Sequence, residues 1–209
     1  MYEYWMMAQK VVWAILCFSL CCWLTYMLAI NLVHGSLKHW KRLRHCSWKV
    51  VLECMAMLFG ILVIAAILVL FLPWMRWSWV TLIMPRSEGS IGGTNLLFLP
   101  IRVKWFGEFF LILLFMNIPM IAYMEEYIFR SGTEDWTDGW IRSILFGLVH
   151  CIAGTPVCAA FLLPFVGLWL THHYFRGGTK RSTLYHTVYN MVAIGFATVL
   201  LVIIRFGHG

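Results

Sequence analysis

The sequence predicts an all-α fold, a polytopic membrane helix bundle with about six transmembrane helices and one interfacial segment. Of 209 residues, 62% are hydrophobic and 12% are charged, whereas soluble domains carry roughly 25% charged residues. The 12 tryptophans cluster at the ends of apolar runs, where indole rings anchor a protein at the headgroup level. No internal repeat divides the chain, so we expect residues 1–209 to form a single integral membrane domain.

Six apolar runs are the third observation behind this fold class. A spanning helix needs about 20 mostly apolar residues, and the fourth run is shorter than that. Gly154-Thr155-Pro156 follows the fourth run and is a stop and turn signal. It favours two separate helices there, with one broken helix as the alternative. The predicted helices are 11–33, 48–72, 107–130, 140–153, 156–174 and 182–205.

Basic loops predict the orientation of these helices. The segments 34–49 and 176–181 hold most of the loop lysines and arginines, and such loops stay on the cytoplasmic side. With six helices, both segments fall on that side, together with the acidic connection 131–139. We therefore expect the net charge of +7 to set the topology and to meet anionic lipid, and we expect no nucleic-acid partner.

The long connection 73–106 is rich in tryptophan. Trp74, Trp77 and Trp79 alternate with Arg76 and apolar residues, which predicts a helix lying in the membrane interface. A flexible loop is expected over 89–94. Two alternatives remain for this connection, a plain surface crossing or a lid over a substrate site.

Two adjacent carboxylates, Glu125 and Glu126, lie near the end of the third apolar run. Acidic residues inside a membrane segment are costly, so they indicate a functional site by default. Glu126 and Arg130 are four residues apart in the favourable order for an ion pair on one helix face. Glu125 lies about 100° further round the helix and is expected to be the carboxylate left free to act.

Two later runs carry polar pairs at the same spacing. His150 follows Phe146 by four residues, and Asn190 follows His186 by four, so each pair shares one helix face. Each pair alone fits interhelical hydrogen bonding. At 1.5 Å per residue, the predicted topology brings Glu125 and both histidines into the cytoplasmic half of the membrane, which indicates one common site.

Such a group suits general acid–base chemistry. A carboxylate buried in a helix bundle can accept a proton from water, and a nearby histidine can orient that water. A second histidine and an asparagine can donate hydrogen bonds to a developing oxyanion. This set fits hydrolysis of an amide in the membrane. A zinc site formed by Glu125, His150 and His186 is the chemical rival, although the sequence lacks HExxH, so we expect neither a metal nor another cofactor.

The three motifs, in this order, resemble the signature of the CPBP intramembrane proteases, also called the Abi family, which includes the type II CAAX prenyl endopeptidases. The resemblance covers about residues 107–205. It implies a metal-independent glutamate protease acting on a membrane-associated protein or peptide. The motifs are Glu125-Glu126-x-x-x-Arg130, Phe146-x-x-x-His150 and His186-x-x-x-Asn190.

The resemblance also implies residue roles. Glu125 would activate the water with help from His150, and His186 with Asn190 would stabilise the oxyanion. Supporting positions would be Glu126, Arg130 and Phe146. The alternative is a non-catalytic membrane scaffold or a bacteriocin-immunity-type partner that keeps the polar cluster for packing. A protein partner or an oligomer is compatible with the Trp-rich surface.

Overall fold

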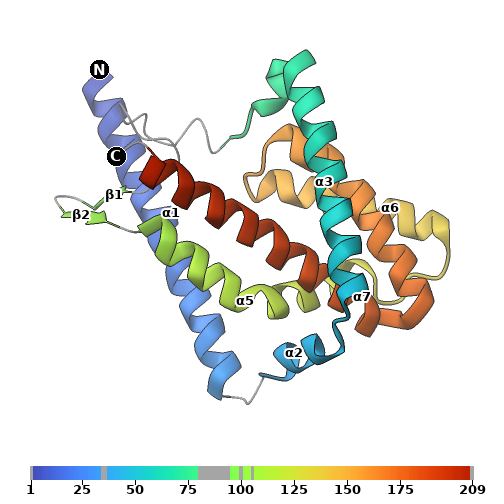
Figure 1. The fold of residues 1–209 in the computed structure, drawn as a ribbon. Helices are drawn as coiled ribbons and strands as arrows, with labels where there is room; N and C mark the ends of the chain where they lie inside the picture. Colours follow the sequence, from blue (N-terminus) through green and yellow to red (C-terminus); the bar gives the residue numbers. More distant parts are fainter. Residues whose placement is uncertain (1, 34–36, 80–94, 99–100, 105, 208–209) are drawn as a thin grey trace. The chain divides into compact units, whose positions relative to one another are not determined.

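The computed structural model describes residues 2–33, 37–79, 95–98, 101–104 and 106–207 (Figure 1). Helices account for nearly all of this part of the chain, which confirms the predicted all-α class. The exception is a short antiparallel hairpin of β1 (Asn95–Phe98) and β2 (Ile101–Lys104). This hairpin lies within the connection 73–106, for which no strand was predicted.

Each of the six predicted apolar segments lies in a helix. Two short 3-10 turns, η1 (Arg42–His45) and η2 (Pro73–Arg76), flank α3. The chain forms two compact units, residues 1–36 with 79–117 and residues 37–78 with 118–209. The helices are α1 (Tyr2–Val33), α2 (Leu37–Lys41), α3 (Trp48–Phe71), α5 (Phe106–Phe129), α6 (Trp136–Ile152) and α7 (Val157–Gly207).

Within the part of the chain that the structure describes, four helical stretches are long and apolar enough to cross a membrane, which supports a membrane protein. They are Met7–Val33, Trp48–Phe71, Phe109–Phe129 and Val157–Leu200. This differs from the predicted six for two reasons. The 17 residues of α6 are fewer than the roughly 20 that a spanning helix needs, and the fifth and sixth predicted segments both lie within α7.

A sharp break divides α7 where a basic loop was expected. The backbone leaves helical geometry at Gly177 (φ −169°, ψ 22°) and Gly178 (φ 64°, ψ −169°). The conformation of Gly178 is one that almost only glycine adopts. Two residues therefore suffice to separate the two halves of α7.

The turn between α6 and α7 confirms that the fourth and fifth predicted segments are separate helices. Gly154 adopts a φ of 92°, a left-handed value that suits glycine. The segment after η2 holds this turn, because Ser78 Oγ donates to Gly154 O at 2.6 Å and Val157 N donates to Trp77 O at 3.0 Å. The end of α3 is thereby tied to the start of α7.

Among the described residues of this connection, the predicted interfacial helix is present as the single turn η2. Trp74 and Trp77 are both about half exposed, as a tryptophan at a membrane surface requires. Pro73 begins the turn, and the chain is extended again by Trp77. The loop expected over 89–94 lies outside the described residues.

Small residues allow α6 to lie very close to α7 within the second unit. A Cβ atom at Gly147 would come within 2.5 Å of the Ala160 carbonyl oxygen, and one at Gly139 within 2.8 Å of Thr171. Close approach through small residues is the usual basis of helix packing in membranes. On its other side, α7 packs on α3 through a core that includes Cys54, Leu170 and Tyr185. These contacts fix where the side chains of α6 and α7 meet.

Candidate functional site

The predicted ion pair between Glu126 and Arg130 forms at the end of α5. Glu126 Oε1 lies 3.6 Å from Arg130 Nη1, and both side chains are fully buried. The same carboxylate oxygen lies 2.8 Å from Nδ1 of His186, on the second half of α7. One carboxylate therefore connects the end of α5 to α7 in the interior of the second unit.

His186 also contacts Glu125, which corrects the expectation that Glu125 is free. His186 Nε2 lies 3.2 Å from Glu125 Oε2, so each ring nitrogen faces a carboxylate. An imidazolium ion can donate from both nitrogens at once. The sequence argument considered only partners on the same helix, whereas this ring enters from another helix between the two acids. With Arg130, two cations then balance two carboxylates.

The two carboxylates differ in their access to solvent. The side chain of Glu125 is 25% exposed, whereas that of Glu126 is 0% exposed. A buried carboxylate between two cations is held in place by its partners. Part of the Glu125 carboxylate therefore lies at the surface of the second unit, whereas Glu126 is enclosed by its partners.

His150 lies half-buried on α6 with its ring orientation fixed by its own helix. Its Nδ1 is 2.7 Å from the carbonyl oxygen of Phe146. A carbonyl oxygen only accepts, so Nδ1 carries the proton, and in the neutral ring Nε2 keeps a free lone pair. Within the described residues no hydrogen bond joins His150 to Glu125 or His186. His150 thus presents a proton acceptor that the other site residues do not occupy.

The ring of Phe146 lies among the charged residues. Arg130 Cζ is 4.3 Å from its centroid, a distance at which an aromatic face attracts a cation. The rings of His150 and His186 approach it edge-on, with centroids at 4.5 and 5.7 Å. Phe146 is 1% exposed. It therefore brings the three motifs into contact.

Asn190 is the predicted site residue that the structure leaves outside these contacts. The other six contact one another and form what we call the network, namely Glu125, Glu126, Arg130, Phe146, His150 and His186. Asn190 lies one helical turn after His186 and is half-buried. Its side chain forms no hydrogen bond within the described part of the chain. The helical spacing keeps it on the same face as His186, so its amide is a donor available to another group.

A second buried histidine, His173, belongs to a cluster that the sequence analysis missed. Arg181 Nε donates to His173 Nδ1 at 3.5 Å. The His173 ring stacks on Tyr185 with centroids 3.5 Å apart and planes 14° apart, and Trp169 meets both rings edge-on. The spacings of four residues from Trp169 to His173 and from Arg181 to Tyr185 were visible signals. Only the break at Gly177 and Gly178 brings the two pairs together.

The positions of the His and Glu side chains can be compared with what a zinc site needs. Among the described residues, no group of three or more His, Cys, Asp or Glu side chains is placed to hold a metal ion. Both nitrogens of His186 already face carboxylates, and Nδ1 of His150 faces a carbonyl oxygen. The network is one of proton donors and acceptors, suited to moving a proton at Glu125 or His150.

Comparison with known proteins found no matching protein family, no similar curated protein and no similar solved structure. The resemblance to the CPBP proteases therefore rests on the three motifs of this chain. The function has to be argued from the network itself.

Proposed function

We propose that this chain is a multi-pass integral membrane endopeptidase of the CPBP type. In this proposal it hydrolyses a peptide bond of a membrane-associated protein or peptide with a water molecule activated by Glu125. The observation that carries the proposal is that His186 joins a fully buried carboxylate to a partly exposed one. Glu126 is fully buried and holds His186, and His186 holds the partly exposed Glu125.

The reaction would begin with proton transfer from water to Glu125. His150 Nε2 accepts the second hydrogen bond of that water, because Nδ1 is committed to a backbone carbonyl. The water oxygen bonds to the carbonyl carbon, and the C=O electron pair moves onto the oxygen. The oxyanion electron pair then re-forms the C=O bond as the C–N bond breaks, and Glu125 returns the proton to the leaving nitrogen. The products are a carboxylic acid and an amine.

The geometry favours a positioning role for His186 over the oxyanion role that the resemblance implies. Its two nitrogens lie 2.8 and 3.2 Å from carboxylate oxygens and are already engaged. The side-chain amide of Asn190 is then the donor that remains for the oxyanion. This assignment keeps all four proposed catalytic positions, Glu125, His150, His186 and Asn190, but changes what one of them does.

Contacts next to the network support placing it in the cytoplasmic half of the membrane. The guanidinium of Arg42 lies 4.7 Å from the ring centroid of Tyr123, two residues before Glu125 on α5. His39 contacts the same ring at 4.7 Å. Both residues belong to the basic segment between α1 and α3, and basic loops mark the cytoplasmic side. The network therefore lies near the C-terminal end of α5, next to this basic segment.

A non-catalytic scaffold or an immunity-type partner is the second candidate. The observation that favours it is that Glu125 already has a partner, His186, at 3.2 Å. In such a protein, buried ion pairs would serve to specify one packing arrangement. The two candidates differ in what the loss of the Glu125 charge does to membrane peptides.

The test is to express Glu125→Gln and His150→Ala and to compare the membrane peptides that accumulate with those of the wild type. We expect uncleaved precursors in both variants and not in Glu134→Gln, a matched loss of an exposed carboxylate outside the network. Abundance and thermal unfolding are measured on the same samples. Wild-type processing by both folded variants would rule out this mechanism. Loss of stability in the two variants without accumulation of any precursor would favour the scaffold.

A further inference from the structure

Basic residues from two distant parts of the sequence meet at one end of the second unit. The segment 37–49 lies at the start of α3, and the break in α7 lies at the same end (Figure 1). Leu43 and Cys46 of this segment pack against the core that contains Tyr185, and η1 contacts α7. The packing therefore holds the two basic segments together.

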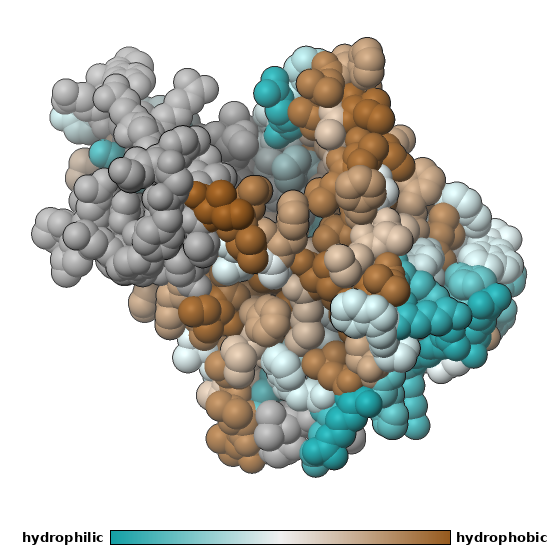
Figure 2. Space-filling view, viewed as in Figure 1, coloured by the Kyte–Doolittle hydropathy of each residue, from teal (hydrophilic) through white to brown (hydrophobic). Residues whose placement is uncertain are grey.

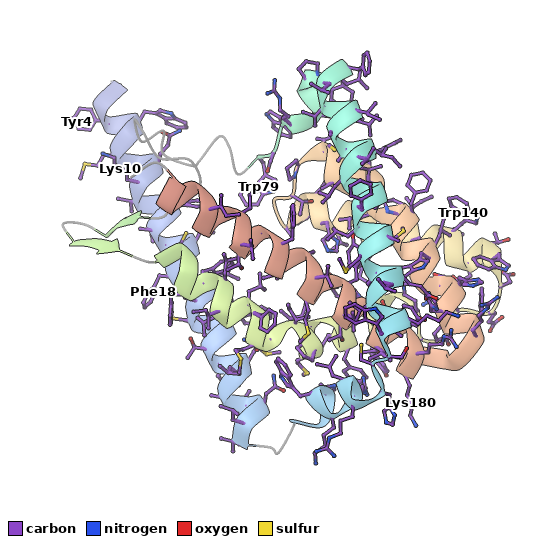
Figure 3. The ribbon with its side chains drawn as sticks, viewed as in Figure 1. Tyr4, Lys10, Phe18, Trp79, Trp140 and Lys180 are labelled. Atoms are coloured by element: carbon purple, nitrogen blue, oxygen red, sulfur yellow. The ribbon has the colours of Figure 1, made fainter. Side chains whose placement is uncertain are left out.

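Five exposed cations form what we call the basic surface, namely Lys41, Arg44, Lys49, Arg176 and Lys180. Figure 2 shows hydrophilic side chains gathered at this end, next to the apolar side of α3. Lys180 projects from this end in Figure 3. The basic surface thus borders a helix that is apolar enough to span a membrane.

The acidic side chains near the basic surface are largely engaged with other partners. Asp138 pairs with Arg142 at 2.8 Å, and Asp135 accepts from a backbone N–H of its own helix start. Glu53 lies 4.0 Å from Lys49, whose side chain is 83% exposed, and an exposed pair of this kind is weak. Among the described acids near this surface, Glu134 and the weakly paired Glu53 are left to offset its charge. Cations therefore outnumber uncommitted acids on this surface.

Lys180 of the basic surface and its neighbour Arg181 occupy an electrostatically unfavourable position. The helix resumes after Gly178, so Lys180 and Arg181 fall in its first turn. The positive end of the helix dipole lies there and favours anions over cations. Arg181 is committed to His173 and lies over Tyr185, whereas Lys180 is exposed. An anion bound here would interact favourably with both the positive end of the helix dipole and the charge of Lys180.

We propose that the basic surface binds the phosphate groups of anionic phospholipids. The surface adjoins the start of α3, where Trp48 is 72% exposed, as at a membrane interface. Near an anionic leaflet, each lysine or arginine increases lipid binding about fivefold. None of the five residues belongs to the carboxylate network, so this proposal does not depend on peptide hydrolysis.

The test measures lipid retention by native mass spectrometry on the purified full-length protein in mild detergent. Phosphatidylglycerol and phosphatidylcholine of equal chain length are titrated separately. We expect the wild type to prefer phosphatidylglycerol. Each double variant, Lys41→Gln/Arg44→Gln or Arg176→Gln/Lys180→Gln, should bind it at least about fivefold more weakly. The charge-matched control Lys10→Gln/Arg76→Gln changes cations outside the surface and should bind like the wild type.

Three outcomes would overturn the proposal. Equal retention of the two lipids would remove the role of headgroup charge. An equal loss in the control would show an effect of net charge alone. Displacement of phosphatidylglycerol by an equal concentration of inorganic phosphate, or by an oligonucleotide, would mean that the surface serves another anion. Thermal unfolding of each variant shows whether it is folded, and binding is compared only among folded variants.

Discussion

Two buried histidines on α7 have opposite surroundings. His186 lies between the carboxylates of Glu125 and Glu126, whereas His173 accepts a hydrogen bond from Arg181 and stacks on Tyr185. Carboxylates on both sides favour a protonated ring, and an arginine donor requires an unprotonated nitrogen. The same residue type is therefore an ion in one cluster and a neutral aromatic in the other.

The comparison predicts different costs for removing each histidine. His186→Leu leaves the buried Glu126 and the partly exposed Glu125 near each other, with Arg130 as the one remaining cation of the network. Breaking a buried charge network costs about 3–5 kcal/mol, and this is the largest loss we expect. The free energy of unfolding in detergent is the measurement. A loss below that of His173→Leu would show that the carboxylates are hydrated or protonated in the folded protein.

A substitution at the kink between the two histidines should cause the second-largest loss of stability. Gly178→Ala puts a Cβ on a backbone with φ 64° and ψ −169°, a conformation whose strain costs about 1–3 kcal/mol. The control is Gly60→Ala within α3, where nothing lies within 4 Å of the added Cβ, so no loss is expected. Unfolding of both variants is compared with the wild type. Equal stability of the two variants would mean that the kink relaxes freely.

His173→Leu should have a smaller effect than either change. It removes a ring stack and one hydrogen bond, each worth about 1 kcal/mol, and leucine restores part of the apolar contact. Thermal unfolding gives the magnitude, and His173→Phe is the matched variant that keeps the ring. If His173→Phe is less stable than His173→Leu, stacking on Tyr185 does not hold this cluster together.

The smallest effect on the free energy of unfolding is expected for the surface pair of Lys49 and Glu53. Lys49→Gln removes a partner 4.0 Å away at a surface position, where such pairs contribute less than about 1 kcal/mol. We expect no measurable change in unfolding, and the same result at 50 and 500 mM salt. A clear salt-dependent loss would show that this pair is shielded from solvent.

Local spacing predicted part of this molecule correctly. The apolar runs predicted every main helix, and the interval from Glu126 to Arg130 predicted a pair that forms. Both depend on residues within a few turns of one another. The roles of individual residues within the protease hypothesis stay predictions.

Tertiary packing decided what the sequence could not show. Glu125 was expected to be free, yet His186 reaches it from another helix. His173 and Tyr185 stack only because two glycines reverse the direction of α7. The spacing between helices depends on small residues such as Gly147, where an added Cβ would come within 2.5 Å of the Ala160 carbonyl oxygen. Such contacts join residues far apart in the sequence, and no periodicity encodes them.

Phe146 has a consequence for how the motifs move. Its ring contacts Arg130, His150 and His186, and it has almost no exposed surface. In a close-packed interior, a side chain with such neighbours cannot change rotamer alone. A shift of α6 would therefore require the end of α5 and the second half of α7 to adjust as well.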